Sequence, residues 1–98
     1  MYTFIENQKS LTICGVLTYE AVGELAATLN EKFKIQDEII LDLNRLQDLN
    51  LKTVVKLVQL QENYSSCRKR IVFRGLQNNS VRGSFGLAGK KQLLQPAV

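Results

Sequence analysis

The chain has 98 residues, of which 45% are hydrophobic and 22% are charged, and it contains neither histidine nor tryptophan. This length suits one domain, residues 1–98, with one hydrophobic core, and the composition is that of a globular protein. The absence of histidine excludes a Ser-His-Asp or Cys-His catalytic relay and any zinc site built with imidazole. The net charge of +4 favours an anionic partner. The composition as a whole argues against an enzyme.

The cysteines and the hydropathy pattern indicate the compartment. Cys14 and Cys67 are far apart in the sequence, and two free thiols in a reducing compartment are favoured over a disulfide. No run of hydrophobic residues is longer than three, which is too short for a transmembrane helix or the apolar region of a signal peptide. We therefore expect a cytoplasmic protein.

The charge is distributed unevenly along the chain. Residues 1–67 carry six Lys or Arg and nine Asp or Glu, whereas residues 68–98 carry seven Lys or Arg and no acid. The densest basic run, Arg68–Arg70, lies where a predicted helix meets a predicted strand, and such a run is usually a solvated turn. The nearest aromatic residues fall at predicted core positions, so they offer no stacking platform for bases. We therefore expect no nucleic-acid partner.

The first half of the chain predicts a β-hairpin followed by a helix. Residues 1–6 and 10–14 are short, β-rich segments on either side of a polar turn. Thr18 is a candidate helix N-cap, with Glu20 in the first turn. Apolar residues then recur at steps of three and four, which predicts an amphipathic helix of about 15 residues. They are Val22, Leu25, Ala26, Leu29 and Phe33.

Two further strands and a second helix are predicted in the middle of the chain. Residues 38–43 and 70–74 contain consecutive apolar residues, which is typical of strands buried on both faces. Between them, a broad apolar stripe predicts a helix with Asn50 or Asp48 as its N-cap. The stripe consists of Leu51, Val54, Val55, Leu57, Val58, Leu60 and Tyr64.

The C-terminal segment predicts a short helix and completes the fold class. Residues 80–89 could form a helix weakened by glycine that presents Val81 and Phe85, and Leu93–Leu94 is a last apolar anchor before a frayed end at residues 95–98. The resulting order is β-β-α-β-α-β-α. It predicts an α/β fold with a mixed sheet of four to five strands and helices packed on it.

Two candidate motifs, a phosphate-binding loop and a pair of catalytic carboxylates, are not supported by the residues present. The glycine-rich segment before Lys90 has Ser84 where a phosphate-binding loop needs glycine, and Lys91 where it needs Ser or Thr. Asp42 and Asp48 are interpreted as loop carboxylates that bind backbone groups. We expect no catalytic residue, cofactor or metal.

Two lysines of the second predicted helix invite a functional interpretation. If the apolar stripe faces the core, Lys52 and Lys56 share the outer face. Lysine in a first helical turn opposes the helix macrodipole by roughly 0.3–1 kcal/mol, and the pair repels by roughly 0.2–0.5 kcal/mol. The pair therefore serves either solubility or a basic docking face for an acidic partner.

The order and spacing of these segments resemble a STAS domain. This is the fold of bacterial anti-sigma-factor antagonists and of the small cytoplasmic subunit of Mla-type phospholipid ABC transporters. The family's Gly-x-Leu before the first helix corresponds to Gly15–Thr18, and its hydrophobic strand ending in Asp-Leu to Ile39–Leu43. The resemblance covers essentially the whole chain. Its last strand and helix match through Ile71, Val72, Phe73, Val81, Phe85 and Gly89.

One site departs from the family pattern. The family carries Asp, a phosphorylatable Ser or Thr and, two positions later, Gly, where this chain has Asn50, Leu51 and Thr53. Leucine has no hydroxyl, so it cannot accept the phosphoryl group that switches an anti-sigma-factor antagonist. Thr53 keeps a hydroxyl nearby, but within the helix. The sequence leaves open whether Leu51 is exposed or belongs to the core.

The segment from Gly15 to Val22 is more similar to the transporter subunit, where a Gly-x-Leu-Thr-aromatic-x-x-Val pattern is common. This resemblance implies a non-enzymatic module that binds the transporter's ATPase subunit and reaches the membrane only through that partner. The alternative is an anti-sigma-factor antagonist-like protein with a degenerate switch site that binds an anti-sigma factor. Whether the chain forms a homodimer stays open. The implied partner contacts are Asn50, Leu51, Lys52, Thr53 and Lys56, with Thr18 and Tyr19 nearby.

Overall fold

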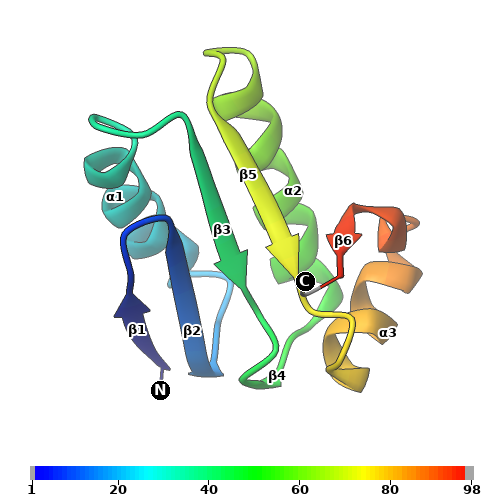
Figure 1. Ribbon diagram of the computed structural model, residues 1–98. Helices are drawn as coiled ribbons and strands as arrows, with labels where there is room; N and C mark the ends of the chain where they lie inside the picture. The colour runs from blue at the N-terminus through cyan, green and yellow to red at the C-terminus, as the bar shows by residue number, and fades with distance from the viewer. Residues whose placement is uncertain (1, 97–98) are drawn as a thin grey trace.

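The computed structural model describes residues 2–96 and contains a six-stranded sheet with three α-helices (Figure 1). Met1 of the predicted first strand and Ala97–Val98 of the predicted frayed end lie outside the described residues. The elements in chain order are β1 (Tyr2–Glu6), β2 (Ser10–Val16), α1 (Val22–Lys32), β3 (Glu38–Asp42), β4 (Leu46–Asp48), α2 (Leu51–Ser65), β5 (Arg70–Arg74), α3 (Asn79–Leu87), a 3-10 turn (Lys91–Leu93) and β6 (Leu94–Gln95).

The sheet is mixed, as predicted. Its strands follow the order β1-β2-β3-β5-β6, and β4 pairs with β2 beyond the end of β3. The hairpin of β1 and β2 is antiparallel and every other pairing is parallel. The predicted fold class is confirmed, and the two short strands β4 and β6 are additions to the predicted order.

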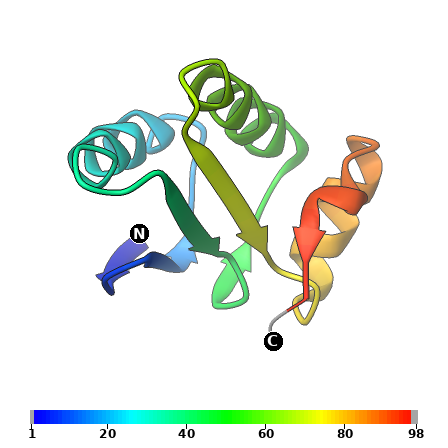
Figure 2. The same ribbon diagram turned by 45° about the horizontal axis from the view of Figure 1, so that its top comes forward.

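All three helices lie on the same face of the sheet (Figure 2). The connections β2-α1-β3, β3-α2-β5 and β5-α3-β6 each move one strand further in the same direction across the sheet. Right-handed crossovers that all run in one direction place their helices on a single face. The prediction that the central strands are buried on both faces is therefore wrong. Ile39, Leu41, Ile71 and Phe73 face the helices and are buried, whereas Ile40 and Val72 on the other face are half-buried.

The first helix begins later than predicted. The hydroxyl of Thr18 accepts a hydrogen bond from the backbone N–H of Ala21 at 3.3 Å, and the Thr18 carbonyl accepts from the same N–H at 3.1 Å. This capped turn precedes α1, which starts at Val22 and has 11 residues. Thr18 therefore caps the approach to the helix and not the helix itself.

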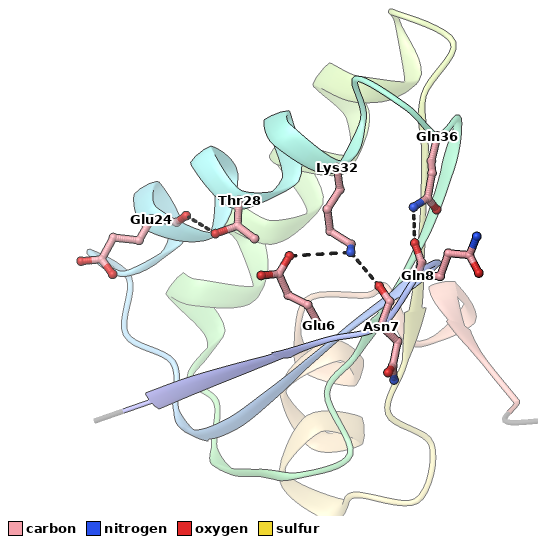
Figure 3. A network of polar contacts seen from close by, with 7 residues as sticks. All are labelled: Glu6, Asn7, Gln8, Glu24, Thr28, Lys32 and Gln36. Atoms are coloured by element: carbon pink, nitrogen blue, oxygen red, sulfur yellow. Dashed lines mark hydrogen bonds and ion pairs between the residues drawn. The ribbon is translucent and has the colours of Figure 1, made fainter.

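Polar contacts hold the hairpin turn against the C-terminal end of α1 (Figure 3). The ammonium of Lys32 donates to the Asn7 carbonyl at 2.7 Å and lies 3.7 Å from the Glu6 carboxylate. Gln36, beyond the helix, donates to the Gln8 carbonyl. These contacts fix the edge strand β1, which pairs with the sheet on one side only.

The side chain of Asn78 joins α3 to the connection between β3 and β4. Its Oδ1 accepts from the Val81 N–H at 3.2 Å and so caps α3. Its Nδ2 donates to the carbonyls of Asn44 at 3.0 Å and Leu46 at 2.7 Å, with Leu43 at 3.5 Å. One amide therefore satisfies backbone groups from two separate segments.

Beyond the end of α2, Arg68 adopts a left-handed backbone conformation with φ of 63°. We expect Arg68→Gly to raise the free energy of unfolding by about 1 kcal/mol, because glycine avoids the Cβ penalty of this conformation. The melting temperature should rise by about 4–8 °C. Ser66→Gly, in the right-handed region at φ −67°, is the control and should lower it. A lower melting temperature for Arg68→Gly would contradict the strain argument.

Candidate functional site

The N-terminal end of α2 is held by a cap that buries one of the predicted contact residues. The Asn50 side-chain oxygen accepts from both the Thr53 N–H and the Thr53 hydroxyl, each at 2.8 Å. Thr53 is completely buried, which is tolerated because its hydroxyl has a partner. Thr53 therefore lies beneath the protein surface, contrary to its predicted place among the partner contacts, while Asn50 itself is exposed.

Burial of Thr53 turns two apolar residues of α2 towards solvent. The buried side of the helix consists of Thr53, Val54, Leu57 and Val58. Leu51 is 42% exposed and Val55, one turn further on, is 44% exposed. Leu51 is therefore exposed and does not belong to the core, a point that the sequence left open. The exposure of Val55 also corrects the prediction that this residue faces the core.

Tyr19 and the two lysines of α2 form one cluster. The ammonium groups of Lys52 and Lys56 lie 4.5 and 4.1 Å from the centre of the Tyr19 ring. Lys56 also donates to the Tyr19 carbonyl at 3.3 Å. A cation over an aromatic face is stabilised by about 0.5–1 kcal/mol at exposed sites, which offsets the repulsion expected between the lysines. Tyr19 is thus a structural partner of both lysines, a role that the sequence alone does not reveal.

These residues make a continuous region that we call the α2 surface: Tyr19, Leu51, Lys52, Val55 and Lys56. Thr18 supports it through the turn that carries Tyr19. The α2 surface continues into a hollow of about 270 Å³ between α2 and the end of α3, and Val55 is common to both. Leu87, exposed by 78%, is a further apolar residue at the end of α3. Val55 and Leu87 were not predicted as surface residues, although the spacing of four from Leu51 could have indicated Val55.

Two residues of the basic run after α2 are paired with acids from the first half of the chain. The Lys69 ammonium lies 2.7 Å from the Asp37 carboxylate, and the Arg70 guanidinium lies 3.3 Å from that of Glu38. The hydrogen bond from Lys69 lowers the pKa of Asp37 below its ordinary value. A carboxyl with a lowered pKa stabilises the fold at neutral pH, and this contribution disappears as the pH falls through that pKa.

A second hollow of about 340 Å³ lies along the outer edge of β5, bordered by Gln61, Lys69 and Arg70. Gln61 donates to the carbonyl of Ile71 there, at 3.0 Å, and so covers part of the strand edge. Cys14 and Cys67 are free thiols, as predicted. Within residues 2–96, no cluster of three or more Cys, Asp or Glu could hold a metal ion, and no helix of that range is long and apolar enough to cross a membrane.

The single-faced α/β arrangement matches the STAS fold. Among solved structures, the chain is similar to the anti-sigma factor antagonist SpoIIAA in its unphosphorylated form. The two share 17% sequence identity with a TM-score of 0.73, and the superposition covers 100% of this chain and 89% of SpoIIAA. No family model and no curated protein matches the chain. The STAS fold expected from the sequence motifs is therefore confirmed.

Proposed function

We propose that the chain is a non-enzymatic protein-interaction module that docks on an acidic partner through the α2 surface. The observation that carries this proposal is the exposure of Leu51 and Val55 beside two lysines. Apolar anchors supply most of the affinity of an interface, while rim charges steer association and suppress wrong partners. An apolar pair bordered by cations suits a partner with an apolar recess and an acidic rim.

The partner that we propose is the ATPase subunit of a Mla-type phospholipid ABC transporter. Support comes from the segment Gly15–Val22, which resembles the transporter subunit and carries Tyr19 into the α2 surface. The leucine at position 51 gives a further argument, because an exposed apolar residue there serves a constitutive contact better than a phosphate-controlled one. The proposal places the chain in the cytoplasm, connected to the membrane only through its partner.

The test is charge reversal on the α2 surface. Lys52→Glu combined with Lys56→Glu should weaken binding to the ATPase subunit about 10- to 100-fold, because two attractive rim charges become repulsive. Affinity can be measured by copurification and by calorimetry on the isolated pair. Lys9→Glu with Lys91→Glu changes the net charge equally outside the α2 surface and should leave binding unchanged. Unaltered binding of the Lys52 and Lys56 variant, with its fold intact, would refute the docking proposal.

The second candidate is an anti-sigma-factor antagonist-like signalling protein without a phosphorylation switch. It is favoured by the fold likeness to the anti-sigma factor antagonist SpoIIAA. In this candidate the α2 surface would contact an anti-sigma factor. Incubation with a cognate kinase and ATP distinguishes a working switch from a lost one. We expect no phosphate on Thr53, because its hydroxyl is buried and bonded to Asn50, and stoichiometric phosphorylation of Thr53 would restore the switch.

A further inference from the structure

The face of the sheet opposite the helices is not covered by any segment within residues 2–96 (Figure 2). Strand alternation places on it the side chains that point away from the buried core. Ile5 on this face is 43% exposed. Ile40 and Val72 lie side by side at its centre, since they are register partners in β3 and β5. Thr12 and Cys14 of β2 complete a mildly apolar surface that we call the open face.

Charged residues flank this apolar centre in a regular pattern. On β3, Glu38 and Asp42 lie on either side of Ile40. On β5, Arg70 and Arg74 lie on either side of Val72. The register pairs Glu38 with Arg70 and Asp42 with Arg74. The open face therefore carries an acidic row directly beside a basic row, each with one apolar residue in the middle.

We propose that the open face binds a second copy of this chain. The two copies would pack with their open faces together, related by a two-fold axis that lies between the two sheets and runs parallel to the strands. With this axis over the midline between β3 and β5, the β3 of each copy lies over the β5 of the other. Glu38, which already pairs with Arg70 of its own chain at 3.3 Å, would then also face Arg70 of the second copy. Asp42 would face its Arg74, and Ile40 would pack on its Val72. The same contacts occur twice, as an isologous interface requires. Among candidate partners, a second copy matches this charge pattern without any further assumption.

The spacing of packed sheets agrees with this arrangement. Aligned sheets pack about 10 Å apart, a gap that an arginine and a carboxylate side chain can bridge together.

The size of the open face sets the strength of the dimer. The five strands from β1 to β6 lie about 4.8 Å apart, and β1, β3 and β5 are each five residues long with a rise of about 3.3 Å per residue. Because β6 has only two residues, the face measures at most about 20 by 17 Å. This is smaller than a standard protein interface, so we expect a dissociation constant in the range of about 10 to 500 µM. Because α2 lies on the other side of the sheet, self-association and docking through the α2 surface do not exclude each other.

The experiment uses analytical ultracentrifugation of the full chain from 10 µM to 1 mM. The average mass should rise with concentration from 11.1 kDa towards twice that value. Glu38→Lys and Arg70→Glu, each at an exposed residue, should weaken self-association at least tenfold, because each creates like-charge pairs across the axis. An equimolar mixture of the two variants should restore association as a heterodimer, because lysine of one copy then faces glutamate of the other.

Several results would overturn the proposal. They are a chain that stays monomeric at 1 mM, self-association that neither variant weakens, or a mixture that associates no better than its components. Binding to anionic vesicles by a chain that remains monomeric would also overturn it, since the open face would then serve a lipid surface. Circular dichroism of each variant establishes that its fold is intact. The Lys52→Glu, Lys56→Glu variant should dimerise like the unmodified chain, which separates this test from that of the proposed function.

Discussion

Replacement of Asn78 by aspartate is expected to lower the free energy of unfolding by about 3 kcal/mol at neutral pH. The substitution keeps the capping oxygen for Val81 but exchanges the donor Nδ2 for an acceptor oxygen. The carbonyls of Asn44 and Leu46 then lose their donor and face a negative charge. These contacts are part-buried, and leaving a buried polar group unsatisfied costs about 1–3 kcal/mol, and more for a charged group. The melting temperature should fall by more than about 10 °C.

The neighbouring Asn79→Asp provides a matched control for this prediction. Asn79 is exposed in the first turn of α3, where a negative charge is favoured by about 0.3–1 kcal/mol. The same chemical change should therefore stabilise at position 79 and destabilise at position 78. The loss at position 78 should shrink as acid protonates the new carboxyl and restores a donor. Equal effects of the two substitutions, measured by chemical denaturation, would show that Asn78 does not join the two segments as described.

Gly75→Ala is expected to cost about 2–3 kcal/mol of stability, because α3 packs directly against this glycine. A Cβ at position 75 would lie 2.4 Å from Val81 Cγ1 and 3.3 Å from Val81 Cβ. Val81 is fully buried and β-branched, so it has little freedom to move away. Overpacking of a filled core typically costs 1–3 kcal/mol.

Two further variants test the cause of this loss. Gly83→Ala, inside α3 with no atom beyond the adjacent residues and backbone of its own helix within 4 Å of the new Cβ, should raise stability by about 0.5–1 kcal/mol. Combining Gly75→Ala with Val81→Ala should cost less than the sum of the two single changes, because the smaller residue makes room for the new methyl group. Strict additivity in this double-mutant cycle would contradict the proposed close approach.

Much of the fold could be predicted because long segments carried strong periodic signals. The helices and the four main strands follow from their apolar spacing, and the STAS motifs place them in order. The short strand β4 could not be predicted, because only Leu46 of its three residues is buried and its pairing with Gly15 and Val16 is a tertiary effect. The prediction that the central strands are buried on both faces was wrong because consecutive apolar residues do not reveal on which side of the sheet the crossovers place the helices.

The candidate site was predictable to the extent that it lies on one helix. Lys52 and Lys56 share a face because of their spacing alone. The sequence did not reveal which side of α2 faces the core. Thr53 can occupy a core position because its hydroxyl donates a hydrogen bond to Asn50, and Val55 is turned towards solvent instead. The position of Tyr19 over both lysines joins residues that lie more than 30 positions apart, and the sequence suggested it only through the family resemblance.

The pairing of β3 with β5 has a consequence for the chain before it folds. Considered as a polymer, the protein is a diblock polyampholyte, with an acidic block of residues 1–67 and a basic block of residues 68–98. In the native state the blocks meet along one ladder, where Asp37 and Glu38 bind Lys69 and Arg70. The same attraction acts between the blocks of the unfolded chain at low ionic strength, and salt screens it. The denatured ensemble is thereby biased towards contacts between the segments that later form the central ladder.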